Sequence, residues 1–177
     1  KVIVAAGGLA GPELGGSRLG YDLLTDLGHP LVPLAPSLVK IKTDHRIPNA
    51  LKGVKVEGAL TLKKGTVAVG RDSGEILFAD YGLSGPPVLQ LSRLLCYENP
   101  TDFTLEIDFL PSFDQGALFA LLKERREVLA AQTMEYYLTG LVQKKVGQLL
   151  LKEALHCKIS REVKSLQDEE LKKIAFY

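Results

Sequence analysis

Two glycine-bounded segments have the residue types and spacing that could bind a small anionic ligand. The first segment joins the paired glycines Gly7 and Gly8 to a second cluster made of Gly15, Gly16 and Ser17. Glycines let a ligand or another backbone approach closely, and free amides ahead of a helix attract anions. The same spacing also fits a flexible connection that binds nothing, and the residues alone favour neither interpretation.

The second segment places polar residues between a predicted strand and the start of a predicted helix. Its residues are Asp80, Tyr81, Gly82, Leu83, Ser84 and Gly85. Ser84 and the Gly85 amide would lie where a helix N-terminus stabilises negative charge. A structural turn is the favoured interpretation, because such caps commonly serve only to satisfy backbone groups.

Generic catalytic motifs are absent from the sequence, and no catalytic residue can be assigned. There is no phosphate-binding loop, no dinucleotide fingerprint and no Cys-x-x-Cys pair. Residues 82–85 lack the spacing of a nucleophile elbow, so a Ser or Gly in this stretch is expected to cap the following helix. The 3 histidines are dispersed, which predicts no metal site, and Cys96 and Cys157 are expected to be inert thiols.

The composition excludes several classes of protein. The 22 basic and 21 acidic residues give a net charge of +1, which argues against a nucleic-acid or anionic-membrane binder. No apolar stretch approaches the ~18 residues of a membrane span. With 2 cysteines the chain cannot build a disulfide framework, so we expect a reducing, cytoplasmic location.

Apolar residues at both ends lead us to expect a piece of a longer chain. Val2, Ile3 and Val4 resemble a strand buried on both faces, and residues 174–177 are again apolar. The opening mimics a signal peptide, but the apolar run is short and continues into glycines, so targeting is not expected.

The chain is expected to divide into three parts of an α+β protein. Residues 1–30 predict a strand, a glycine turn and a helix over 20–27 that ends at Gly28, with Leu23, Leu24 and Leu27 as its apolar face. Residues 31–111 contain all 9 prolines but two, and residues 112–177 have helical periodicity.

Residues 31–111 predict a small antiparallel barrel or sandwich. Residues 54–62 and 103–109 alternate apolar and polar side chains, and shorter strands are expected at 39–41, 67–69 and 75–78. Residues 63–65 and 72–74 are the hairpin-turn candidates. One helix is expected from Gly85 to Leu95.

Residues 112–177 predict three helices. Ser112 is expected to cap the first, which has a stripe of Leu118, Leu122 and Leu129. Ser165 is expected to cap the third. The second helix has the strongest amphipathic pattern, formed by Leu138, Leu141, Val142, Val146 and Leu149.

Several motifs resemble those of a bacterial family of FAD-dependent oxidoreductases, also described as NAD(FAD)-utilising dehydrogenases or aminoacetone-oxidase-like flavoproteins. The family has VIVATGG, then P-x-x-G-S-x-G-x-G-Y…LGH, then P-x-L-V, and then GE-x-LFTHFGLSGP. The corresponding stretches here are residues 2–8, 12–29, 36–39 and 74–86. The final helix and the apolar strand start expected after it also resemble the family.

The resemblance implies an architecture and a cofactor. A Rossmann-type FAD domain would be split by an insertion made of a barrel-like domain (31–111) and a helical part (112–177). Residues 1–30 would then be the end of that FAD domain, with Gly7, Gly8, Gly15, Gly16 and Ser17 against the cofactor. Residues 80–85 would face the flavin or a small-molecule substrate, and NAD(P)H is the candidate reductant.

On this interpretation the chain acts together with the rest of its parent protein. The dinucleotide fingerprint that would hold the FAD pyrophosphate is missing, so the 177 residues alone are expected to hold FAD poorly and to be inactive. The inserted part would act as a lid and shape the substrate pocket.

Departures from the family pattern keep the substrate open. Ala6, Asp80 and Tyr81 stand where the family has Thr, His and Phe, and residues 14–20 lose an acidic residue. An alternative remains, in which the chain is a standalone, non-enzymatic barrel and helical module that binds a protein partner through apolar surface. A dinucleotide fingerprint upstream of Lys1 would distinguish the two.

Overall fold

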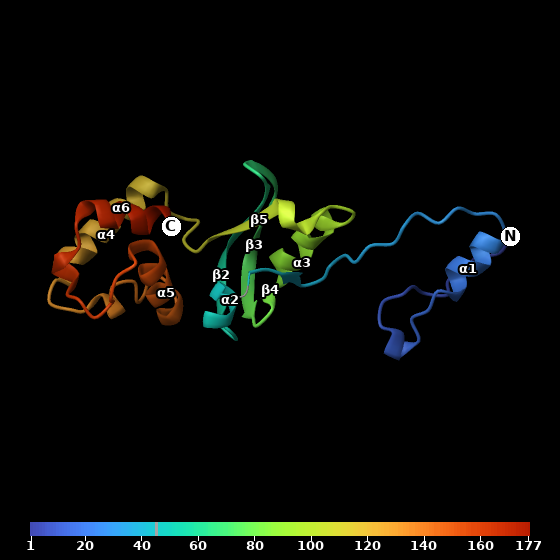
Figure 1. Cartoon of the computed structure of the whole chain (residues 1–177), viewed down its shortest axis with the longest axis horizontal. Helices are drawn as coiled ribbons and strands as arrows, with labels where there is room; N and C mark the ends of the chain where they lie inside the picture. Colours follow the sequence, from blue (N-terminus) through green and yellow to red (C-terminus); the bar gives the residue numbers. More distant parts are fainter. Residues whose placement is uncertain (45) are drawn as a thin grey trace. The chain divides into compact units, whose positions relative to one another are not determined.

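A computed structural model describes residues 1–44 and 46–177. The chain forms two compact units, Lys1–Ala35 and Pro36–Tyr177. Figure 1 shows the smaller unit in blue, with one helix and glycine-rich loops. The larger unit contains the sheet and the remaining helices.

The smaller unit is built around helix α1 (Leu19–Asp26), which agrees with the predicted helix. A 3-10 turn, Pro12–Leu14, precedes it. The strand predicted at residues 2–4 is wrong, since the backbone there is irregular and Val2 and Ile3 are 90% and 92% exposed. A strand needs hydrogen-bonding neighbours, and no other strand is described in this unit. The predicted apolar face of α1 is not a core either, because Leu23 and Leu27 are exposed.

The larger unit begins with a curled, five-stranded antiparallel half-barrel. Its strand order is β1-β4-β3-β2-β5. The strands are β1 (Ile41–Lys42), β2 (Lys55–Lys64), β3 (Val67–Ala79), β4 (Gly82–Ser84) and β5 (Phe103–Asp108). Two short helices pack against this sheet, α2 (Arg46–Ala50) and α3 (Pro86–Ser92). The mixture of this sheet with helices confirms the predicted α+β class.

The long hairpin β2–β3 confirms one predicted turn and overturns the other. The chain reverses at Gly65, as predicted. Asp72 and Ser73 instead lie inside β3, where Gly74 pairs with Gly58 of β2. The local turn propensity of this stretch is overridden because β2 supplies a partner along the whole length of β3. The two short strands predicted at 67–69 and 75–78 are therefore one strand.

The half-barrel closes over an apolar core. The predicted alternation places Leu60 and Leu62 inside the fold, and the alternation in β5 is also confirmed. Helix α3 covers one side through Val88 and Leu91, which are buried. The largest buried members of this core are Leu51, Leu60, Leu62, Ile76, Phe78 and Val88.

Three further helices form a helical module after β5, as predicted. They are α4 (Gln115–Val128), α5 (Lys144–Leu155) and α6 (Asp168–Phe176). Helix α5 starts later than its apolar pattern suggests, so Leu138, Leu141 and Val142 precede it. Residues 174–176 continue α6, so the strand start expected there is wrong.

Both predicted N-caps of these helices are wrong by a few residues. Asp114, not Ser112, caps α4, and its carboxylate accepts a 2.7 Å hydrogen bond from the Ala117 amide. Helix α6 starts with a capping box between Gln167 and Glu170. The Ser165 hydroxyl donates instead to the Glu162 carbonyl in the preceding 3-10 turn, because Ser165 lies too far ahead of the helix.

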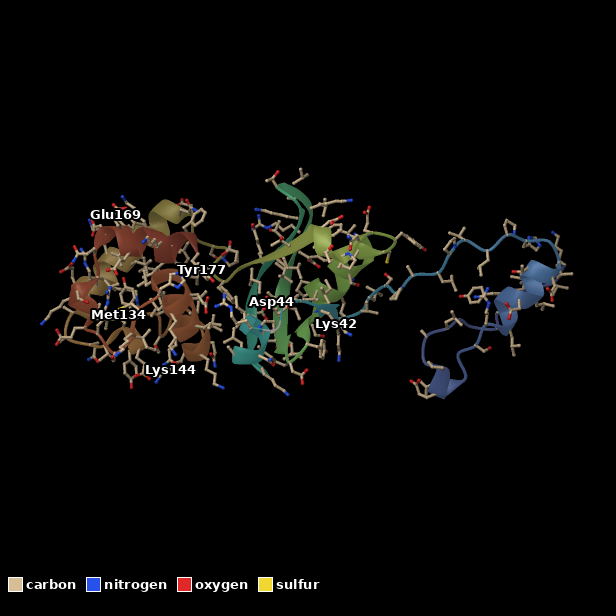
Figure 2. The ribbon with its side chains drawn as sticks, in the orientation of Figure 1. Lys42, Asp44, Met134, Lys144, Glu169 and Tyr177 are labelled. Carbon is tan, nitrogen blue, oxygen red and sulfur yellow. The ribbon has the colours of Figure 1, made fainter. Side chains whose placement is uncertain are left out.

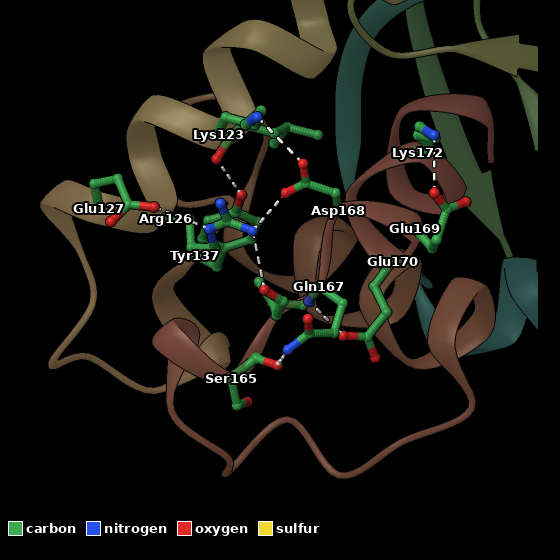
Figure 3. A network of polar contacts seen from close by, with 12 residues as sticks. Lys123, Arg126, Glu127, Tyr137, Ser165, Gln167, Asp168, Glu169, Glu170 and Lys172 are labelled. Atoms are coloured by element: carbon green, nitrogen blue, oxygen red, sulfur yellow. Dashed lines mark hydrogen bonds and ion pairs between the residues drawn. The ribbon is translucent and has the colours of Figure 1, made fainter.

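A network of polar contacts connects α4 with α6 inside the helical module (Figure 3). Arg126 of α4 donates to the Leu166 carbonyl at 3.1 Å and to Asp168 of α6 at 2.7 Å. The Arg126 hydrogen bond holds the pKa of the Asp168 carboxyl below its usual value. The Tyr137 hydroxyl donates to the Leu122 carbonyl at 2.6 Å, and burial raises the pKa of this phenol.

The Glu170 carboxylate makes the free energy of unfolding depend on pH in the acid range. Burial alone would raise its pKa, but the Gln167 amide at 2.9 Å and the Arg161 guanidinium at 2.6 and 2.7 Å lower it below 4.5. A carboxyl whose pKa is lower in the folded state stabilises the fold above the unfolded pKa. This contribution is lost as the pH falls through the folded value.

We expect Glu170→Gln to lower the free energy of unfolding at pH 7 by about 1.5–3 kcal/mol, the value of hydrogen bonds to a charged group. The difference from the wild type should shrink below about pH 4.5, as measured by urea unfolding across a pH series. Glu169→Gln, in the exposed pair with Lys172, is the control and should cost at most about 0.5 kcal/mol. A Glu170 effect that does not change with pH would contradict this assignment.

Candidate functional site

The structure brings the two predicted glycine clusters of the smaller unit together. Gly16 lies against the backbone of Gly8 and Ala10, and a side chain at Gly16 would approach the Gly8 carbonyl to 3.0 Å and the Ala10 carbonyl more closely. The Gly16 amide donates to the Gly11 carbonyl at 3.1 Å. The space that the missing side chain of Gly16 leaves is therefore occupied by the chain's own backbone.

Gly7 and Gly15 leave their backbones open. Both have positive φ angles, 76° and 92°, and no other atom lies within 4 Å of the space a side chain would occupy. Ser17 is half-buried, two residues ahead of α1. Open backbone of this kind fits the close approach of a planar ring or a phosphate. The sequence of this unit lacks the dinucleotide fingerprint that would hold a pyrophosphate.

The segment at 82–85 belongs to the interior of the half-barrel. Strand β4 lies between β1 and β3, with Leu83 paired to both Ile41 and Phe78. Side chains at Gly82 and Gly85 would overlap the carbonyls of Ile41 and Glu75. These glycines therefore let the strands approach one another, which is a packing role.

The start of α3 offers an anion fewer donors than most helix N-termini. Its first two residues are Pro86 and Pro87, which have no amide hydrogen. Gly85 occupies the N-cap position without a side chain, and Ser84 is buried. The arrangement at the start of α3 is therefore dominated by packing.

Asp80 and Tyr81 form the exposed turn between β3 and β4, where two lysines approach them. Lys52 Nζ lies 2.9 Å from Asp80 Oδ2, and this contact lowers the pKa of the Asp80 carboxyl. Lys40 Nζ lies 5.5 Å from the centre of the Tyr81 ring, and Tyr81 raises the pKa of Lys40. The turn thus carries an ionised carboxylate, a phenol and two ammonium groups.

The lysines at this turn were missed in the sequence because they come from distant positions. Lys40 precedes β1, and the pairing of β1 with β4 brings it to the turn. Lys52 follows α2, and the backbone hydrogen bond from the Gly53 amide to the Phe78 carbonyl brings it there. No motif connects these positions. Among residues 1–44 and 46–177, no group of three or more His, Cys, Asp or Glu could hold a metal. No helix in that part of the chain has the length and apolarity that a membrane crossing needs.

The fold defines a class of protein: a half-barrel domain with a helical module, preceded in the chain by a small unit with glycine-rich loops. Residues 35–177 match the family model described as "HI0933-like protein barrel and H2TH domain". The chain belongs to this family, which is related to flavoprotein oxidoreductases.

Curated relatives have two kinds of named activity. The chain is 31% identical over 177 residues to the 3-dehydro-bile acid delta(4,6)-reductase of Clostridium scindens, which covers 97% of this chain and 43% of that enzyme. It is 31% identical over 158 residues to the ribosomal RNA dihydrouridine synthase of Haemophilus influenzae, which covers 88% of this chain and 36% of the relative. The enzyme of the same name from Escherichia coli is 33% identical over 153 residues, with 85% and 36% covered. The chain spans under half the length of these relatives.

Proposed function

We propose that this chain is the barrel and helical insertion of an FAD-dependent reductase, together with a loop that contacts the flavin. The observation that carries the proposal is the extent of the similarity to the bile acid reductase. It covers 97% of the chain and so includes most of Lys1–Ala35, outside the barrel and H2TH model. The open backbones of Gly7 and Gly15 support a contact with a cofactor in that loop.

The names of the relatives support reduction of a carbon–carbon double bond. A delta(4,6)-reductase and a dihydrouridine synthase both have names that imply a product with added hydrogen. FAD, reduced in turn by NAD(P)H, would supply a hydride for such a reaction. The residues of this chain would bind the substrate, orient it and exclude water from it.

Residues at the β3–β4 turn are the proposed flavin-facing group. Lys52 lies beside the Asp80 carboxylate and lowers its pKa, and Tyr81 presents a phenol next to Lys40. Gly82, Leu83, Ser84 and Gly85 hold this turn in the sheet, which makes them positioning residues. The remainder of the parent protein is the proposed partner, and the cytoplasm is the proposed location.

The visible spectrum of the purified full-length gene product tests this proposal. We expect flavin absorption that persists through purification, and FAD in the supernatant after denaturation. The 177-residue chain alone is the matched control and should be colourless, since it lacks the pyrophosphate fingerprint. A colourless full-length protein that does not take up added FAD would refute the proposal and leave the partner-binding alternative.

A further inference from the structure

A wide apolar cleft lies inside the larger unit, between the edge of the half-barrel and the helical module. Its volume is about 1360 Å³, above the ~300–1,000 Å³ typical of small-molecule sites. One wall is β5, an edge strand that pairs only with β2. Lys42, Asp44 and Tyr177, labelled in Figure 2, are among the lining residues.

The walls of the cleft are apolar side chains that the fold leaves partly uncovered. Phe103, Leu105 and Ile107 form the apolar face of β5, yet all three are half-buried. Phe113, which links β5 to α4, is 40% exposed, and Phe176 at the end of α6 is 81% exposed. Aromatic surface of this extent is costly to leave in water, so it favours an apolar occupant.

Two of the four cations that line the cleft have no ion-pair partner among the described residues. The lining carboxylates already have donors: Glu153 pairs with Arg46, Glu106 with Lys63, and Asp108 accepts from the Leu110 amide. The fourth, Asp44, accepts from the Arg46 amide. Lys42 and Arg71 also line the cleft, and neither has an ion pair within the described residues. An anionic group on the occupant could form an ion pair with Lys42 or Arg71.

We propose that this cleft binds an amphipathic anion with a rigid apolar body, of the steroid carboxylate class, as the substrate of the reductase. The proposal rests on the function proposed above, because the bile acid reductase has one of the two activities named among the three relatives described. The charge of the cleft favours the bile acid over RNA as the substrate. Its lining has four cations and four carboxylates, so it lacks the excess of basic residues that binding of an RNA phosphate backbone requires.

Binding of deoxycholate, below its micelle-forming concentration, to the full-length protein tests the proposal by equilibrium dialysis. Phe113→Ser and Phe176→Ser should each raise Kd about tenfold, since each removes apolar contact area. Val128→Ser is the matched control: Val128 is 76% exposed but lies at the end of α4, outside the lining, and Kd should change less than about twofold.

The anionic group is tested with the double variant Lys42→Gln, Arg71→Gln. Its Kd for deoxycholate should rise about fivefold, and the effect should diminish at high salt. The double variant Arg93→Gln, Lys158→Gln removes two exposed cations outside the cleft and should leave Kd unchanged.

The outcomes separate this proposal from the function on which it rests. Flavin-containing protein that does not bind deoxycholate, or binds it equally well in all cleft variants, overturns the cleft proposal alone. Tight binding of ribosomal RNA in place of deoxycholate overturns it in favour of a nucleic-acid substrate. Colourless protein whose deoxycholate binding is lost in the cleft variants supports the cleft while refuting the flavoenzyme.

Discussion

Replacement of Gly85 by alanine is expected to lower the free energy of unfolding by about 3–5 kcal/mol. Gly85 has φ 107° and ψ 161°, a conformation that residues with a side chain rarely adopt. The new methyl group would also overlap the Glu75 carbonyl of β3, which the sheet holds in place. Relief of that overlap requires separation of α3 from β3, so the backbone must move and not only a side chain.

Gly140→Ala is the matched control for Gly85→Ala. Gly140 also has a positive φ, 89°, but the space for its side chain is empty. Only the conformational strain applies there, so the expected cost is about 1–2 kcal/mol. Urea unfolding followed by circular dichroism measures both variants. Equal losses at the two positions would contradict a packing role for the 82–85 segment and would revive a ligand-binding role.

The sheet and its main turn could be predicted because their signals are local and repeated. In β5 a period of two separates the faces, and in β2 the same alternation places Leu60 and Leu62 inside the fold. Gly65 marks the reversal between β2 and β3. In the helical module the apolar stripes predicted α4, α5 and α6 for the same reason. Burial of one face of an element leaves a pattern in the sequence whatever the partner is.

The errors fall where a distant partner decides the local structure. Asp72 and Ser73 favour a turn by composition, but β2 holds them in a strand. Residues 2–4 have the composition of a buried strand and no neighbouring strand in their unit. Ser112 and Ser165 are good capping residues that lie ahead of the first helical turn, and the side chains of Asp114 and of the Gln167–Glu170 pair cap the helices instead.

The candidate site was predicted only in part for a related reason. The glycine clusters were found by composition, but contact of Gly16 with Gly8 shows that some of their freedom serves the chain's own backbone. Lys40 and Lys52 reach the β3–β4 turn from separate segments, so no spacing in the sequence predicts their contacts with Tyr81 and Asp80. The apolar cleft likewise depends on how β5 and the helices are arranged, which no single stretch encodes.

Loss of the Tyr137 side chain is expected to destabilise the helical module most strongly. Tyr137 is fully buried, and its ring fills the core formed by Leu122, Met134 and Leu171. Tyr137→Ala should lower the free energy of unfolding by about 3–5 kcal/mol through the cavity it leaves. Tyr137→Phe keeps the ring and removes only the 2.6 Å hydrogen bond to the Leu122 carbonyl, so about 1–2 kcal/mol is expected.

Tyr136→Ala is the neighbouring control for Tyr137→Ala. The Tyr136 ring is exposed and contacts Lys144 Nζ at 4.4 Å from its centre, a contact worth about 0.5–1 kcal/mol. A loss at Tyr136 as large as that at Tyr137 would show that the 3-10 turn itself, and not burial of the ring, is what matters.

Amide hydrogen exchange would show which elements lose protection in Tyr137→Ala. The sheet core and the helical core share few side chains, of which Val142 and Leu150 are two. Amides of α4 and α6 should therefore lose protection while those of β2 and β3 keep most of theirs. Because α4 and α6 supply one wall of the cleft, the same variant should also lose deoxycholate binding while retaining flavin. Uniform loss of protection across sheet and helices would show that the two cores form one cooperative unit.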